Sequence, residues 1–251
     1  MYSKNFLSNV ILRADFISEE ISLRNELNNE VKSLIAKKFP IIEERIITET
    51  TVVISNDKHE RINKEEKYTE WHFFSSNREM EFCITSKFIY INLTKYTRYE
   101  VLKNNFLIIC NEFQKQYSNT MVHRIGLRYI DQIEPVSPQI SISDWGKYWN
   151  NYINKKLLGG LYFLENNNVL TRYMSNIELN YDDVMLRFQY GIFNEDYPAV
   201  NKKNKFIIDT DIYSMGAYSF SDIENNIDRF HEKAKNYFEN AIKEKLRKIM
   251  E

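Results

Sequence analysis

The order of its periodic segments constrains what this chain can fold into more than any other feature. Residues 1–118 show an alternating apolar pattern, an apolar stripe at helical spacing, four further strand-like stretches and a second helical stripe. Residues 119–251 show the same order. Alternation is typical of strands, and apolar residues at i, i+3 and i+4 are typical of helices. The sequence therefore predicts an α+β fold made of two similar β-α-β4-α halves, 1–118 and 119–251.

Turn and capping residues give approximate boundaries to these elements. In the first half we expect strands at 9–16, 46–55, 70–75, 80–86 and 87–95, and helices at 23–39 and 97–117. In the second half we expect strands at 121–134, 161–164, 169–180, 184–193 and 206–213, and helices at 144–158 and 223–249. Capping boxes at 97–100 and 221–224 predict two helix starts, and Gly159-Gly160 predicts a helix end.

Connections between the elements are short. The most polar stretch, 56–67, is predicted to be an exposed, mobile loop. Two prolines within 134–138 interrupt any regular element and mark the plausible seam in the chain. Since there is no Gly/Ser-rich linker, we expect one compact unit or two halves in close contact.

If both halves contribute their strands to one sheet, the result is a curved, mainly antiparallel sheet covered by helices on one face. This order of elements resembles the TATA-binding-protein-like fold. The resemblance is topological and covers the whole chain. It implies a shape and only weakly a function, because one fold can support many functions.

Composition excludes several classes of protein. The 34 Lys and Arg residues are balanced by 35 Asp and Glu, which excludes a uniformly basic nucleic-acid binder. Apolar residues make up 43% of the chain, enough for a substantial core. No apolar run approaches the ~20 residues that span a bilayer, so we expect a cytoplasmic protein with no membrane partner. Cys83 and Cys110 are predicted to be core residues.

Sequence motifs for common catalytic chemistry are absent. The chain has no GxGxxG, no phosphate-binding loop ending in GK[ST], no HExxH and no GxSxG. The four histidines lie in different predicted elements, without ligand spacing. We therefore expect no cofactor and no histidine-based metal site, and the catalytic residues, if any exist, are unknown.

A strand with two arginines is the first candidate site. Alternation places Arg124, Gly126 and Arg128 on one face of the strand. Two guanidinium groups beside a glycine could hold phosphates, because arginine binds them bidentately and glycine allows close approach. The alternative is structural pairing with carboxylates such as Asp15, or Glu49 and Glu178.

Asp209 and Asp211 form the second candidate site. Both point the same way from one strand, about 6.6 Å apart. They could share a divalent cation or divide acid and base roles, provided that a third ligand comes from elsewhere. The alternative is that they pair with Arg172 and Arg187 on neighbouring strands.

Aromatic residues are the third feature, with 36 Phe, Tyr and Trp among 251 residues. Aromatic rings that face outward from a sheet can stack on unpaired bases, and Trp71 is our candidate for such a contact. Most of the others are expected to fill the core, because Phe and Tyr are common in strands.

Three segments, 5–16, 124–131 and 206–213, carry a further resemblance. With the long terminal helix, they resemble a sporadically distributed bacterial and archaeal family of about this length. Its patchy occurrence is typical of mobile or defence-associated genes. The shared motif is a strand signature rather than a catalytic one, so the resemblance implies no active-site residue.

These observations favour a non-catalytic binding subunit of a prokaryotic, anti-phage defence system. Arg124, Arg128 and Trp71 would contact single-stranded nucleic acid or a protein partner. The alternative function is a metal-assisted phosphodiester hydrolase that uses Asp209 and Asp211. A third possibility is a homo-oligomeric scaffold assembled through the terminal helix.

Overall fold

The computed structural model describes residues 2–54, 61–135, 144–165 and 167–251. Nine strands of this part of the chain form one sheet, in the order β2-β3-β4-β5-β1-β6-β9-β8-β7, and every neighbouring pair is antiparallel. The strands are β1 (Leu7–Phe16), β2 (Ile41–Ile54), β3 (Arg61–Phe74), β4 (Met80–Ile84), β5 (Phe88–Leu93), β6 (Val122–Ile133), β7 (Tyr173–Tyr181), β8 (Val184–Ile192) and β9 (Phe206–Tyr218).

Six α-helices and four short 3-10 helices connect and cover these strands in the described residues. The α-helices are α1 (Asn29–Ala36), α2 (Tyr99–Gln116), α3 (Trp145–Trp149), α4 (Gly159–Phe163), α5 (Ile223–Ala241) and α6 (Glu244–Met250). The 3-10 helices are η1 (Ile21–Arg24), η2 (Lys155–Leu158), η3 (Asn167–Val169) and η4 (Phe220–Asp222).

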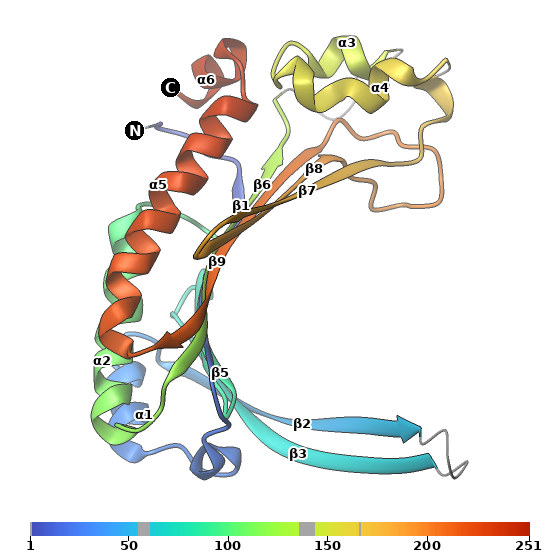
Figure 1. Cartoon of the computed structure of the whole chain (residues 1–251). Coiled ribbons are helices and arrows are strands. Elements are labelled where there is room, and N and C mark those ends of the chain that lie inside the picture. The colour runs from blue at the N-terminus through green and yellow to red at the C-terminus, as the bar shows by residue number, and fades with distance from the viewer. Residues whose placement is uncertain (1, 55–60, 136–143, 166) are drawn as a thin grey trace.

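The sheet is strongly curved (Figure 1). The helices α1, α2 and α5 lie along one side of it, with α5 against β6 and β9. Both ends of the sheet bend away from these helices, so that β2 and β3 at one end and β7 and β8 at the other project in the same direction (Figure 1). The face opposite α5 is therefore concave, and we call it the open face.

Each half places its first strand at the centre of the sheet, where β1 pairs with β6. On one side β5, β4, β3 and β2 follow outward, and on the other side β9, β8 and β7 follow. The fold is thus α+β with an open antiparallel sheet, as predicted from the sequence.

Alternation along the central strands builds the core. In β1, Val10, Leu12, Ala14 and Phe16 are buried, whereas the residues between them are partly exposed. The facing helix α5 buries a stripe at the expected spacing, including Ile223, Ile227, Phe230 and Ala234. Each large apolar side chain buried in this way stabilises the fold by about 1.5–3 kcal/mol.

The predicted strand at 161–164 is wrong, because residues 161–163 lie in α4 and Leu164 is its C-cap. The second half therefore adds only three strands after its helices. Gly159 is the C-cap of η2, but Gly159-Gly160 also begins α4, so the chain continues as a helix where an end was predicted. A Cβ atom at Gly160 would lie 2.6 Å from the ring of Tyr173, so this glycine lets α4 approach β7 closely.

Two predicted helices are interrupted. The helix expected at 144–158 ends after Trp149, and Asn154 caps a new 3-10 helix by accepting a hydrogen bond from the Lys156 amide. The helix expected at 223–249 breaks between α5 and α6, because Ile242 is extended and forms a β-bridge with Ile153. In both cases a tertiary or capping contact outweighs helical periodicity.

The predicted helix starts also shift. The capping box of Ser219 and Asp222 opens the 3-10 helix η4, which leads into α5, and it lies two residues before the expected 221–224 box. Arg98 is the N-cap of α2 and makes no capping hydrogen bond, so the box at 97–100 is wrong. The helix expected at 23–39 is split into η1 and α1, because Asn28 caps a separate start.

The loop predicted at 56–67 is wrong for the part of this stretch that the structure describes. Residues 61–67 belong to β3 and pair with β2 as far as Arg61 opposite Ile54. Backbone hydrogen bonding to the neighbouring strand does not depend on apolar side chains, which explains why the composition misled the prediction. Residues 55–60, and 136–138 of the proline seam, lie outside the described residues.

Candidate functional site

Strand β6 contributes to two separate sites, one on each face of the sheet. Arg124 and Arg128 point to the open face, and the alternate residues Tyr129 and Asp131 are buried on the α5 side. The neighbouring strand β9 alternates in the same register, because Arg128 lies opposite Asp211 and Tyr129 lies opposite Thr210. The 124–131 motif is therefore divided between the two faces.

On the open face, Arg124 and Arg128 are bound to the two aspartates that the sequence analysis singled out. Arg128 donates from Nε to Asp209 Oδ1 over 2.8 Å and from Nη2 to Oδ2 over 2.5 Å. Arg124 donates from Nη2 to the Asp211 carboxylate over 3.3 Å and lies 3.6 Å from Asp15. The two candidate sites are thus one ion-pair network.

Two more arginines extend the network across β1 and β8. Arg187 lies 3.3 Å from Asp211, and Arg13 lies 2.6 Å from Asp15. The four arginine side chains are 25–40% exposed, whereas Asp209 and Asp211 are only 10–11% exposed. The carboxylates therefore lie beneath the guanidinium groups, which form the outer layer. We call these four arginines the arginine layer.

The pKa directions agree with this picture. Burial raises the pKa of Asp211, and the charges of Arg124 and Arg187 oppose that rise. The hydrogen bond to Asp209 raises the pKa of Arg128. The network is held together by opposite charges in a partly dry environment, where ion pairs are stronger than at a fully exposed surface.

Gly126 makes room for Arg124. A Cβ atom at Gly126 would lie 2.7 Å from Arg124 Nη1, and the guanidinium also lies over the ring of Tyr213 at 4.5 Å from its centre. The expected role of Gly126, close approach of a ligand, is therefore corrected. The space above this glycine is filled by the arginine itself.

The structure resolves most of the pairing alternatives. Asp15 is a partner of Arg124, and Arg187 is a partner of Asp211, as the structural interpretation predicted. Arg172 instead lies over the ring of Tyr197. Two other expected partners are engaged elsewhere: Glu49 pairs with Lys87, and Glu178 accepts a hydrogen bond from Asn176.

Trp71 is only 2% exposed and belongs to the hydrophobic core. It cannot stack on a base, because alternation in β3 turns it away from the open face. The aromatic rings on the open face are others. Arg13 covers the ring of Phe88 at 3.8 Å, and Phe88 stacks on Tyr90.

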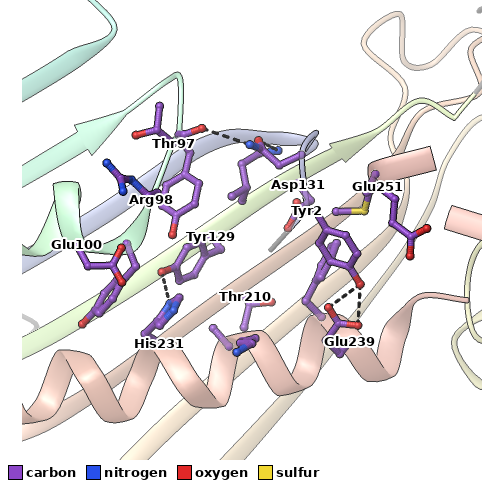
Figure 2. Close-up of a pocket in the computed structure, with 18 residues that line it drawn as sticks. Tyr2, Thr97, Arg98, Glu100, Tyr129, Asp131, Thr210, His231, Glu239 and Glu251 are labelled. Carbon is purple, nitrogen blue, oxygen red and sulfur yellow. Dashed lines mark hydrogen bonds between the residues drawn. The ribbon is translucent and has the colours of Figure 1, made fainter. Parts of the chain in front are cut away.

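The second site is a cavity of about 630 Å³ between α5 and strands β6 and β9. Figure 2 shows Tyr129, Thr210 and His231 around it, with α5 along one side and Tyr2 and Glu239 near one end. The start of α2 closes the other end with Tyr99 and its neighbours. We call this space the α5 cavity.

Asp131 is the unusual residue of the α5 cavity. Its side chain lines the cavity, the residue is 5% exposed, and in the part of the chain that the structure describes no hydrogen bond or ion pair reaches its carboxyl group. Burial alone raises the pKa of Asp131 to about 8. Asp131 ends the 124–131 segment that the sequence analysis singled out, three residues after Arg128, and no role was predicted for it.

Next to Asp131, three rings form a fixed cluster. The Tyr129 hydroxyl lies 2.7 Å from His231 Nδ1, and the His231 ring stacks on Tyr99 with 3.9 Å between ring centres. Burial lowers the pKa of His231, so the imidazole is predominantly neutral near pH 7. It therefore supplies no positive charge to Asp131.

One cluster in the described residues has the donor set for a metal ion: Glu70, His72 and Cys83, with ligand atoms within 4.8 Å of one another. A nitrogen, a thiolate and a carboxylate together suit zinc. Both ring nitrogens of His72 already have carboxylate partners, Nδ1 at 2.7 Å from Glu81 and Nε2 at 3.0 Å from Glu70. Burial opposes protonation of His72, but these two hydrogen bonds raise its pKa. The carboxylates therefore favour a protonated imidazole, and the cluster needs no metal ion to satisfy its charges.

No protein-family model matches this chain, and no curated protein matches its sequence. Within the described residues, none of the helices is both long and apolar enough to cross a membrane.

Proposed function

We propose that this protein is a non-catalytic binding protein whose open face takes single-stranded nucleic acid through its phosphates. The observation that carries the proposal is the arginine layer at the surface of a concave sheet. Two buried aspartates hold three of its guanidinium groups, and the partly exposed Asp15 holds Arg13. A role in a prokaryotic defence system remains an expectation of the family resemblance.

Fixed arginines suit this task. Arginine presents five N–H donors in a rigid fork, so a group that uses one edge on an aspartate keeps donors for a phosphate on the other edge. Because the aspartates hold the guanidinium groups in place, less side-chain entropy is lost when a phosphate binds. The pairing also explains how a chain with near-zero net charge can still present a cationic layer.

The matching strand order of the two halves supports a concave binding surface. We infer that the two halves arose by duplication, because β1 and β6 are central and the remaining strands follow outward in matching order. Helices on one face would leave the other face for a ligand, as in the TATA-binding-protein-like shape. β2 has no counterpart in the second half.

The geometry favours binding over the metal-assisted hydrolase. Asp209 is held bidentately by Arg128, and Asp211 is shared by Arg124 and Arg187. A divalent cation would have to displace these guanidinium groups and would be repelled by the charges left nearby. The two carboxylates are therefore better suited to hold the arginines in place than to bind a metal ion.

A charge-neutral double substitution tests the proposal. Arg128→Gln with Asp209→Asn removes one guanidinium and its buried partner together, so neither charge is left unpaired. Arg229→Gln with Asp183→Asn removes an Arg–Asp pair of 2.8 Å on the exposed side of α5 and serves as the matched control. Net charge is unchanged in both variants.

Fluorescence anisotropy with labelled single-stranded DNA and RNA, repeated over a salt series, is the measurement. We expect the Arg128/Asp209 variant to bind about tenfold more weakly and with a salt slope smaller by roughly 0.7–1. The control variant should bind like the unmodified protein. Equal binding by all three proteins would contradict the proposal. If neither DNA nor RNA binds the unmodified protein at low salt, the proposal is also wrong, and a protein partner becomes the better explanation.

A further inference from the structure

The α5 cavity, on the opposite side of the sheet from the arginine layer, has no part in nucleic-acid binding. We propose that it binds a small organic amine, whose protonated nitrogen pairs with the Asp131 carboxylate while its apolar body lies among the surrounding rings. The argument rests on the unpartnered acid, the aromatic lining and the balance of charge.

An unpartnered acid in this position destabilises the folded protein. Asp131 lies opposite Leu7 on β1 and Ile208 on β9, so its flanking strand partners are apolar. Burying a polar group without a partner destabilises a folded protein, and burying a charged one destabilises it more. Among the described residues, no donor forms a hydrogen bond with the Asp131 carboxyl group. In the Glu70–His72–Cys83 cluster, by contrast, both ring nitrogens of His72 have carboxylate partners. A bound cation would supply the missing partner.

The lining of the cavity suits an ammonium group with an apolar body. Rings line it from several directions, and they belong to Tyr2, Tyr96, Tyr99, Tyr129 and Phe238. Aromatic faces attract cations, most strongly when water is excluded, and they also pack against apolar groups. A cavity of this size is within the usual range for small-molecule sites.

The charges around the cavity also favour a cation. Four acidic residues and two basic residues line it. The bases, Arg98 and Lys235, are both exposed, so they lie at the rim rather than beside Asp131. His231 is the one imidazole in the lining, and burial keeps it neutral. The interior of the α5 cavity therefore holds a buried acid and no buried base.

Isothermal titration with three amines and one neutral analogue tests this proposal. The probes are 2-phenylethylamine, benzylamine, hexylamine and 2-phenylethanol, in which a hydroxyl replaces the amine. We expect at least one of the amines to bind and the alcohol to bind about tenfold more weakly or not at all, because a charge-assisted hydrogen bond contributes about 1.5–3 kcal/mol.

Asp131→Asn is the decisive variant, because it keeps the shape of the side chain and removes the charge. It should lower amine affinity at least about tenfold while leaving the protein folded. Asp182→Asn is the matched control, since it makes the same substitution at an exposed aspartate outside the cavity, and this variant should bind amines normally. A thermal melt of each variant separates loss of binding from loss of fold.

Three outcomes would overturn the proposal: no heat with any amine at millimolar concentration, equal affinity for the amine and the alcohol, or unchanged amine affinity in Asp131→Asn. None of these outcomes bears on the open face, since Asp131 lies on the other side of the sheet. Oligonucleotide binding by Asp131→Asn should be normal.

Discussion

At the scale of single residues, the charged side chains of β6 differ in whether they have a partner of opposite charge. Arg124 and Arg128 are paired with aspartates, while Asp131 is buried and pairs with none of the residues that the structure describes. The physical difference is the face of the strand, because each step of one residue moves a side chain to the other side of the sheet. A single motif can therefore hold a stable ion-pair network and a destabilising acid.

The destabilising acid leads to a prediction about pH. The pKa of Asp131 is about 8 in the folded protein and about 4 in an unfolded chain. Between these values the folded state binds the extra proton, so the free energy of unfolding should fall as pH rises from about 4 to about 8. The loss should reach several kcal/mol, since one pKa unit corresponds to about 1.4 kcal/mol.

Asp131→Asn should remove this loss, so the variant should be more stable than the unmodified protein near pH 8 and similar to it near pH 4. Urea denaturation at a series of pH values measures the difference. Glu100→Gln should follow the unmodified protein, because Glu100 is exposed. Parallel stability curves for Asp131→Asn and the unmodified protein would show that this carboxyl group has a partner after all.

At the scale of elements, packing against a neighbour decides several boundaries. The segment 161–164 has strand-like residues but forms α4, which approaches β7 over Gly160. The Tyr173 ring lies over this glycine, and the Tyr173 hydroxyl donates to the Leu157 carbonyl over 2.9 Å. The two glycines at the start of α4 therefore have different environments.

Alanine at these two glycines should have opposite effects. Gly160→Ala would place a Cβ atom 2.6 Å from the Tyr173 ring and should destabilise the protein by about 1–3 kcal/mol. Gly159→Ala meets no atom within 4 Å and should be neutral or stabilising by up to about 1 kcal/mol, because alanine restricts the unfolded chain. Chemical denaturation of both variants measures this contrast, and equal effects would refute the packing explanation.

At the scale of the whole molecule, residues 1–118 and 119–251 both contribute strands to one sheet, and their helices α2 and α5 contact each other. β1 and β6 pair along most of their length at the centre. Behind the sheet, Asp228 of α5 accepts hydrogen bonds from Tyr99 at 2.7 Å and Lys103 at 2.8 Å, both on α2. Separating the halves would expose apolar surface and leave two long strand edges unpaired.

We therefore predict that neither 1–118 nor 119–251 folds alone as a monomer. Each fragment should show weak near-ultraviolet circular dichroism and poor solubility, and co-expression should restore a folded heterodimer. The full chain purified in parallel is the control. A monomeric fragment with a cooperative thermal transition would show that the halves are independent domains.

How much of the candidate site could be predicted depends on the range of the interactions. Alternation alone placed Arg124 with Arg128, and Asp209 with Asp211, on single faces of their strands. It did not show that the arginines and aspartates bind one another, because strand neighbours are decided by the whole sheet. Trp71 was misjudged for the same reason, since alternation does not say which face is covered.

Local periodicity by itself determined the class of fold and most of its strands and helices, because the repeat of apolar residues depends only on backbone geometry. The sequence could not determine where α5 breaks, which strand follows β6 in the sheet, or that Asp131 would be buried beside a cavity. Those features depend on contacts between residues that are far apart in the sequence, some by more than a hundred positions, and such contacts exist only once the chain has folded.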